Sequence, residues 1–424
     1  MNQAAVNAAW RVVLLVGLRG SVVSAQTDAT VRLPGAALER DTLSALSESR
    51  LRLLPTATRA LWQTYVARSR AAQAVDRALL ARELAPRGRT TMMRAPFIAK
   101  SFDFAPPRAR VRENADSVRR FSEAMLSFQT PSGGWSKHVD FSKGIRQPGQ
   151  SFFSENEHWQ YIATIDNDAT TSELRYLMQR EREAATPAVR DAVAHGVQYL
   201  LDAQFPNGCW PQVWPLQGGY HDNATFNDDA IVEVMQLLDD VGHNAAPYVA
   251  AAAQRAAALA VQRAVQCVLQ AQVRVNGQLT VWGQQHNPLT LEATGARSYE
   301  LTSLVSKESA GVVDFLITHT TLDARIPVAV NAAVAWFERV KIRGMRNDGK
   351  NGLIADTAAG ALWARMYEIG TNKPIFSNRD GIKQYDFQQL TDRREGYGWY
   401  SDLPTRTLAN YATWLTVRAK GVAR

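Results

Sequence analysis

The sequence predicts an all-α fold in which helix hairpins stack as a toroid or a solenoid. The main observation is an internal repeat, in which residues 125–135 match residues 200–210 and a looser third copy spans 268–282. Its tryptophans Trp135, Trp210 and Trp282 are separated by 75 and 72 residues. Alternating runs of β-branched residues are few, whereas apolar residues recur at helical spacing. A repeat unit of this kind buries its apolar face only against its neighbours, which predicts stacking.

Each repeat unit reads as a helix ending in Leu-x-x-Gln, a glycine turn, a tryptophan-bearing loop and the next helix. We expect these loops to gather at one end of the fold. The tryptophans allow two interpretations: they stack on sugar faces, or they plug the ends of helices.

Length and composition are those of an ordinary soluble protein. The 424 residues suit one large domain or two smaller ones, with 46% hydrophobic and 21% charged residues. No run approaches the ~20 apolar residues of a membrane span, so no membrane partner is expected. Cys209 and Cys267 allow at most one disulfide, and their redox state is left open.

The first 25 residues have the pattern of a secretory signal. An apolar stretch from Val12 to Leu18 is followed by Val23-Ser24-Ala25, which predicts cleavage after Ala25 and a secreted or periplasmic protein. A buried N-terminal segment is the alternative. Cleavage removes two arginines and no acid, so the formal charge falls from +8 to +6. A basic exported protein suits an acidic polysaccharide. Nucleic acid is not expected because basic helices, zinc spacings and Arg/Gly tracts are missing.

Residues 26–38 are polar, and a helical pattern extends from about Asp41 to Leu84 before Pro86-Arg87-Gly88 stops it. Residues 87–112 read as a connection, either a domain boundary or a segment wrapped on the surface of one domain. We therefore predict an N-terminal helical segment over 26–115, belonging to the same domain as a toroid over 116–424, and a monomer. Further helices are predicted around 328–340 and 407–415.

Three polar stretches follow the tryptophan loops, and we interpret them as helix starts that face one cleft. They are Asp166-Asn167-Asp168, Asn227-Asp228-Asp229 and the segment 295–298 with Arg297. Asp and Asn at a helix start can simply cap free backbone N–H groups. Two acidic starts in one chain also suit one cation site, because Ca²⁺ takes clustered oxygen ligands.

Several cations stand in loops where they can bind carboxylates. Lys137 follows Gly-Gly-Trp-Ser, and Arg379 and Arg393 lie in glycine-rich stretches, where arginine forms bidentate pairs with carboxylates. The alternatives are a solvated lysine and structural ion pairs. The histidines show no zinc-ligand spacing.

Several ordered motifs closely resemble polysaccharide lyase family 10, the pectate lyases with an (α/α)3 toroid fold and long active-site loops at one end. The resemblance extends from about residue 120 to 405. It rests on Gly-Gly-Trp-Ser-Lys (133–137), Asp-Asn-Asp-Ala-Thr-Thr (166–171), Pro-Asn-Gly-Cys-Trp-Pro-Gln (206–212), Thr-Phe-Asn-Asp-Asp-Ala (225–230), Gly-Ala-Arg-Ser-Tyr-Glu (295–300) and Ser-Asn-Arg-Asp-Gly (377–381).

The resemblance implies cleavage of α-1,4-linked polygalacturonate by Ca²⁺-assisted β-elimination. It implies Asp166 and Asp228 as calcium ligands with Asn167 beside them, and Arg297 as the Brønsted base. The positions that match substrate-binding residues are Lys137, Asn167, Arg379 and Arg393. Because arginine normally stays charged, with a pKa above ~12, a base role requires crowding by positive charge or alkaline conditions.

Two other functions use the same residues. An inverting glycoside hydrolase on an (α/α) toroid would employ Asp166 and Asp228 as its acid and base. A non-catalytic polyuronate-binding protein would use the arginines and tryptophans only to hold the ligand.

Overall fold

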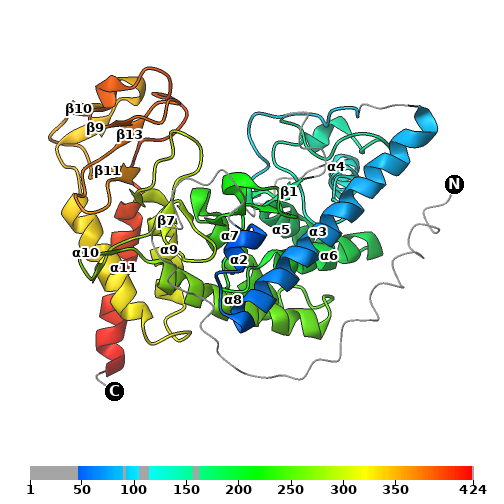
Figure 1. Ribbon diagram of the computed structural model, residues 1–424, viewed down its shortest axis with the longest axis horizontal. Coiled ribbons are helices and arrows are strands. Elements are labelled where there is room, and N and C mark those ends of the chain that lie inside the picture. Colours follow the sequence, from blue (N-terminus) through cyan, green and yellow to red (C-terminus); the bar gives the residue numbers. More distant parts are fainter. Residues whose placement is uncertain (1–45, 89–91, 105–113, 156–161, 423–424) are drawn as a thin grey trace.

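The computed structural model describes residues 46–88, 92–104, 114–155 and 162–422 (Figure 1). The predicted signal segment 1–25 and the polar stretch 26–38 lie outside these residues. The longer helices are α3 (Thr56–Leu84), α4 (Ala115–Ser127), α5 (Thr171–Glu183), α6 (Pro187–Ala203), α7 (Ala230–Gly242), α8 (Ala251–Ala271), α9 (Lys307–Thr318), α10 (Ile326–Val340) and α11 (Pro404–Val422). The all-α prediction is confirmed, and the helices expected near 328–340 and 407–415 are α10 and α11.

The helices form hairpins that stack side by side. The hairpins are α5 with α6, α7 with α8, and α9 with α10, and the array extends from α4 to α11 across Figure 1. Helices α5, α7, α9 and α11 contact one another in that order, and α4, α6 and α8 do the same in a second row. The helix starts of the first row therefore lie next to one another.

The repeated tryptophans plug the ends of helices. Trp135, Trp210 and Trp282 are each 0% exposed. Each indole Nε1 donates to a carbonyl near the end of the preceding helix, at 2.7–2.8 Å, from Met125, Leu200 and Val268 respectively. The sugar-stacking interpretation is therefore wrong for these three side chains.

A fourth tryptophan, Trp363, continues the pattern by donating to the carbonyl of Phe337 in α10. It lies outside the repeat that the sequence predicts. The connection between α10 and Trp363 lacks the glutamine and the spacing of the other units.

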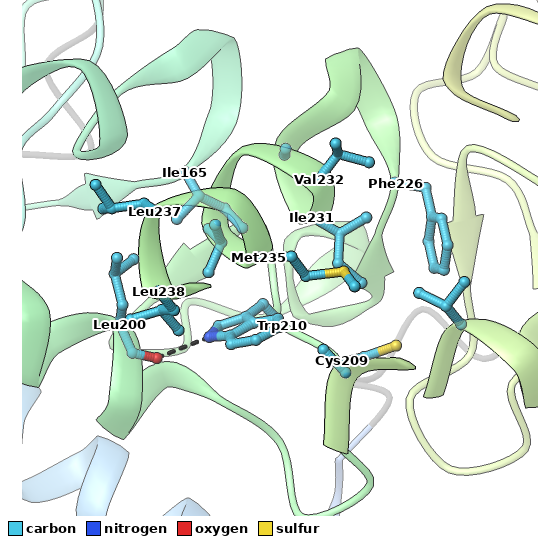
Figure 2. Close-up of a cluster of buried hydrophobic side chains, with 14 of the residues drawn as sticks. Ile165, Leu200, Cys209, Trp210, Phe226, Ile231, Val232, Met235, Leu237 and Leu238 are labelled. Atoms are coloured by element: carbon cyan, nitrogen blue, oxygen red, sulfur yellow. Dashed lines mark hydrogen bonds between the residues drawn. The ribbon is translucent and has the colours of Figure 1, made fainter. Parts of the chain in front are cut away.

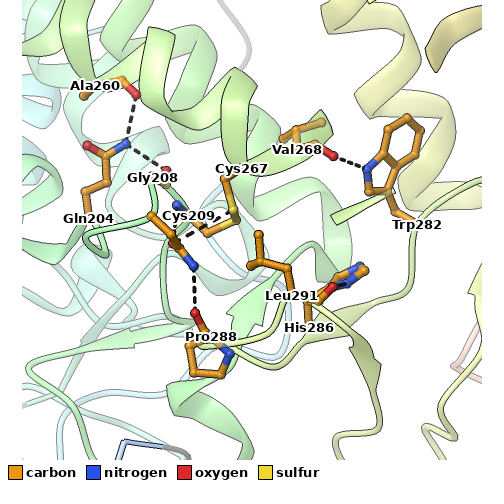
Figure 3. Close-up of a disulfide and its surroundings, with 11 residues drawn as sticks. Gln204, Gly208, Cys209, Ala260, Cys267, Val268, Trp282, His286, Pro288 and Leu291 are labelled. Atoms are coloured by element: carbon orange, nitrogen blue, oxygen red, sulfur yellow. Dashed lines mark hydrogen bonds between the residues drawn. A yellow bond between two sulfur atoms is a disulfide. The ribbon is translucent and has the colours of Figure 1, made fainter. Parts of the chain in front are cut away.

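The repeated glutamines join each unit to the next. The amide of Gln204 donates at 2.8 Å both to Gly208 in its own turn and to Ala260 in α8 (Figure 3). Gln129 and Gln272 bind the equivalent carbonyls of α6 and α10. Each glutamine thus satisfies buried carbonyls of two units, which explains its recurrence at this position.

Short strands link the loops at one end. Those near the helix starts are β1 (Ala163–Thr164), β2 (Val213–Trp214), β3 (Ala224–Thr225), β6 (Gln285–His286), β7 (Ala293–Thr294), β8 (Leu304–Val305), β11 (Trp363–Ala364) and β12 (Met366–Tyr367). The others are β4 (Arg274–Val275), β5 (Gln278–Leu279), β9 (Met345–Asn347), β10 (Leu353–Ala355), β13 (Phe376–Ser377), β14 (Lys383–Gln384) and β15 (Tyr400–Ser401). Strands β1, β3 and β8 pair antiparallel with β2, β6 and β12, each of which follows the next tryptophan. These pairs bring the loops of successive units together.

The hydrophobic core lies between the hairpins. Around Trp210 it contains Leu237 and Leu238 of α7, with Met235 and Ile231 close by (Figure 2). Cys209 beside this tryptophan is bonded to Cys267 of α8, with a Cα–Cα separation of 5.6 Å (Figure 3). The open redox question is thereby answered by a disulfide that ties a tryptophan loop to the next hairpin.

Helix α3 packs on the start of the array. The Tyr65 hydroxyl donates to the Ala203 carbonyl at 3.0 Å, and Tyr65 also packs edge-on against Phe205. The buried carboxylate of Asp76 accepts the N–H of Ser132 at 2.8 Å, in the turn before Trp135. In the described part of the chain, no helix is long and apolar enough to cross a membrane.

Candidate active site

The first two acidic helix starts have the same unusual backbone. Asn167 and Asp168 have φ values of 51° and 61°, and Asp228 and Asp229 have 48° and 62°. These left-handed conformations are uncommon outside glycine, but Asn and Asp tolerate them. They lie in short 3₁₀ turns, residues 166–168 and 227–229, separated by one residue from β1 and β3 and by at most two residues from the starts of α5 and α7.

The third helix start is not where the sequence suggested. The strand equivalent to β1 and β3 is β8, since Val305 donates to Trp282 as Thr164 and Thr225 donate to Trp135 and Trp210. The residues that follow β8 are Ser306, Lys307 and Glu308, at the start of α9. Arg297 instead lies in the loop between β7 and β8. The prediction that it occupies the third helix start is wrong, because this loop precedes the strand.

One cavity of about 310 Å³ opens among these loops. It is lined by Lys137, Asp166 and Arg297 from the predicted set, the first two from the unit of Trp135 and the third from the unit of Trp282. The predicted residues Asn167, Asp228, Arg379 and Arg393 lie outside its lining. Asn227 of the second predicted helix start also lines it. Side chains that sequence reasoning did not single out complete the lining: Phe153, Glu155, Ile162, Thr164, Gln212, Val213, Tyr220, His221, Gln285 and Glu300.

Lys137 and Asp166 form an ion pair at the cavity. The ammonium of Lys137 lies 2.6 Å from Oδ2 of Asp166 and 3.4 Å from Oδ1 of Asn167. Burial alone would lower the pKa of Lys137, but the carboxylates of Asp166 and Glu155 raise it above its ordinary value. Lys137 is therefore charged at any working pH and can bind an anion.

Asp228 is held by two cations. Its Oδ1 lies 2.7 Å from Nζ of Lys307 and 3.0 Å from Nη2 of Arg365, and its Oδ2 accepts from Asn227 at 2.8 Å. Burial would raise the pKa of Asp228, but Arg365 and Lys307 hold it well below its usual range. Asn227 also donates weakly to Asp166, at 3.4 Å, and so connects the two acidic helix starts.

Arg297 is paired with Glu300, three residues later. Its Nε donates to Oε2 at 2.8 Å and its Nη2 to Oε1 at 2.5 Å. Burial alone would lower the pKa of Arg297, but this carboxylate keeps it above its ordinary value. The guanidinium also lies 5.0 Å from the ring centre of Tyr299, on which Arg393 stacks at 4.5 Å.

Arg379 approaches the same corner through its backbone, because its carbonyl accepts the hydroxyl of Ser298 at 2.6 Å. The positive charges of Arg297, Arg393 and Arg379 all act on Tyr299 at this corner, where they oppose the rise that burial gives to the pKa of its hydroxyl.

A profile of the pectic acid lyase family matches residues 129–408, more than half of the chain. The chain belongs to the pectic acid lyase family. A solved family 10 polysaccharide lyase from Cellvibrio cellulosa is 35% identical, with a TM-score of 0.63, and the match covers 70% of this chain and 91% of that chain. A mutant of the Cellvibrio cellulosa lyase in complex with trigalacturonic acid is 34% identical at the same TM-score, covering 70% of this chain and 92% of that chain. No curated protein matches.

These matches confirm the resemblance to family 10 and the assignment of the protein as a pectate lyase, in preference to a hydrolase or a binding protein. Helices α3 and α4 of this lyase both precede the residues that the family profile matches.

Three residues that sequence reasoning missed in this lyase, Gln212, Gln284 and Arg365, share a position with the predicted Lys137. Two positions after each repeated tryptophan stand Lys137, Gln212, Gln284 and Arg365. Lys137 and Gln212 line the cavity, whereas Gln284 binds Asn227 at 3.0 Å and Arg365 binds Asp228. This spacing was a signal available in the sequence.

His221 lines the cavity as a neutral group. Burial is the main cause that lowers its pKa to about 4, so the imidazole is uncharged near neutral pH. It therefore adds no cation to those that Lys137 and Arg297 contribute.

Proposed function

We propose that the enzyme cleaves polygalacturonate by Ca²⁺-assisted β-elimination with Arg297 as the base, and that it works outside the cell or in the periplasm. The observation that carries this proposal is that Lys137, Asp166 and Arg297 line one cavity. A cation for the uronate carboxylate, an acidic ligand for a metal and a nitrogen base thus lie within reach of one sugar unit.

The donors fit calcium in chemical type. Asp166, Asn167 and Asp228 offer carboxylate and amide oxygens, which Ca²⁺ prefers. Asp166 keeps one oxygen, Oδ1, that makes only the 3.4 Å contact with Asn227, while its Oδ2 pairs with Lys137. Asp228 would have to exchange its contacts with Lys307 and Arg365. When bound, the metal would act as a Lewis acid on the uronate carboxylate.

The chain's own residues bind and deprotonate the sugar. Lys137 binds a substrate carboxylate, which withdraws electron density from C5. A nitrogen of Arg297 takes the C5 proton, the C5–H electron pair forms the C4–C5 double bond, and the C4–oxygen bond breaks to release the leaving chain. Arg379, Arg393 and Asn167 bind neighbouring uronates. Only a neutral guanidine can accept the proton, so the rate should climb towards alkaline pH.

The test is polygalacturonate digestion followed by ultraviolet absorbance of the unsaturated product, with and without chelator. Excess chelator should abolish the signal and added Ca²⁺ should restore it. Full activity in chelator would contradict the calcium requirement. New reducing ends without absorbance would indicate hydrolysis.

The base is tested with Arg297→Lys, which keeps the charge but moves the nitrogen. Misplacing a reacting group by ~1 Å costs on the order of a hundredfold. We expect turnover to fall by at least that factor, with binding of trigalacturonate largely kept. Near-native turnover would remove Arg297 from the mechanism.

A further inference from the structure

We propose that Glu300 is the positioning residue of this elimination: by holding Nε and Nη2 of Arg297, it presents Nη1 as the nitrogen that meets C5. This inference rests on the proposed role of Arg297 as base.

The geometry is that of a side-on carboxylate–guanidinium pair. Glu300 is 4% exposed and accepts three hydrogen bonds from Arg297, from Nε at 2.8 Å, from Nη2 at 2.5 Å and from the backbone N–H at 3.1 Å. The turn is closed by the N–H of Glu300, which donates to the carbonyl of Arg297 at 2.7 Å. Within the described ranges, no hydrogen-bond acceptor engages Nη1, and the Arg297 side chain is 44% exposed. One nitrogen is therefore available to substrate while the others are fixed.

Glu300 is itself fixed from behind. The hydroxyl of Tyr397 lies 3.3 Å from Oε1 of Glu300 and 3.2 Å from Oε1 of Gln284. Gln284 donates to Asn227 at 3.0 Å, and Arg365 donates to the carbonyl of Tyr397 at 2.7 Å. This buried network connects the carboxylate that holds the base to the second acidic helix start. The distance between Arg297 and the acidic side of the site is thereby set by hydrogen bonds and not by a flexible loop.

We infer that the carboxylate of Glu300 both orients the guanidinium of Arg297 and stabilises its charged form. A carboxylate beside arginine stabilises the charged guanidinium, so it opposes formation of the neutral base. Once the C5 proton has arrived, the same carboxylate stabilises the cation that forms. This is the relation of an aspartate to the histidine that it orients in a serine hydrolase triad. Glu300 touches Arg297 and not the reacting carbon, which defines it as a positioning residue.

The experiment compares Glu300→Gln and Glu300→Asp with wild type in pH profiles of kcat and KM on polygalacturonate. The glutamine variant lacks the charge, so the alkaline rise of kcat should move to lower pH while the maximal kcat falls by about a hundredfold through loss of orientation. The aspartate variant keeps the charge but is one methylene shorter, so kcat should fall without a pH shift. KM should change little in either.

A matched control is Glu183→Gln, which removes the carboxylate of another Arg–Glu pair three residues apart, at 2.8 Å, at the end of α5. It should leave both profiles unchanged. If the Glu300 variants do not fold, Tyr397→Phe removes the hydroxyl behind Glu300, and a lower kcat with unchanged KM is then expected.

A native pH profile and a native kcat in Glu300→Gln would overturn the positioning role. If the Glu300 variants do not fold, a native kcat in Tyr397→Phe would overturn it. If Arg297→Lys is inactive while Glu300→Gln behaves as wild type, only the positioning role fails. If Arg297→Lys stays active, the base assignment fails, and with it the inference built on it.

Discussion

The disulfide between Cys209 and Cys267 should contribute several kcal/mol to stability while leaving catalysis intact. The two cysteines are 58 residues apart, and both are fully buried. Closing a loop of that length lowers the entropy of the unfolded chain, which stabilises the fold by about 4 kcal/mol at 25 °C. Neither sulfur lines the cavity. Replacing both cysteines by alanine should therefore destabilise the fold and spare the site.

The expected change in melting temperature follows from chain length. Unfolding entropy near 2.1 cal/mol/K per residue gives about 0.9 kcal/mol/K for 424 residues. A loss of about 4 kcal/mol then lowers the Tm by about 5 °C, and the space left by two sulfurs lowers it further.

Scanning calorimetry of the double alanine variant measures this shift. Wild type refolded in reductant is the control, because it keeps both sulfurs and lacks only the bond. Turnover well below the melting temperature should match wild type. A Tm within about 1 °C of wild type in both samples would refute the loop-closure reasoning.

Two further outcomes are expected. Lys307→Gln removes a cation from Asp228, and loss of a charged hydrogen bond worth about 1.5 kcal/mol should tighten Ca²⁺ binding about tenfold. Isothermal titration of Ca²⁺ without substrate measures this affinity. The control is Lys143→Gln, which removes an exposed lysine from its pair with Asp140. An unchanged affinity in Lys307→Gln would argue against the competition. Burial raises the pKa of Asp76 to about 7, above the unfolded value near 3.9, so stability is lost as pH rises across that window. The Tm of Asp76→Asn minus the Tm of wild type should thus be higher at about pH 8 than at about pH 5. The same Tm difference at both pH values would contradict this.

The repeat made the architecture predictable. The spacing of Trp135, Trp210 and Trp282 identified the hairpins because each tryptophan and glutamine satisfies carbonyls that every unit leaves free. The unit around Trp363 escaped detection because its helix cap uses no glutamine. A periodic pattern identifies units that satisfy their free carbonyls with the same residues. A unit that satisfies them with other residues is not predicted by the pattern.

The site was predictable by residue type but not by pairing. The acidic starts at Asp166 and Asp228 stood out as local motifs, whereas the partners of Asp228 are 79 and 137 residues away in the chain. Lys307 also follows no recognisable motif. Arg297 was placed at a helix start because the strand β8, two residues long, gives no signal of its own. Ion pairs between distant loops are set by the fold, and sequence spacing does not encode them.

The paired charges couple the binding of substrate and cation in the proposed function. Lys137 is neutralised by Asp166, Asp228 by Lys307 and Arg365, and Arg297 by Glu300. A uronate carboxylate that takes Lys137 releases Asp166 for a metal, and a metal on Asp166 releases Lys137 for a carboxylate. Each ligand thus removes the internal competitor of the other. By linkage, the increase in calcium affinity caused by oligogalacturonate must equal the increase in oligogalacturonate affinity caused by calcium. In the free enzyme the acidic and basic residues of the site pair with one another. They exchange these partners for cation and substrate when the two ligands bind together.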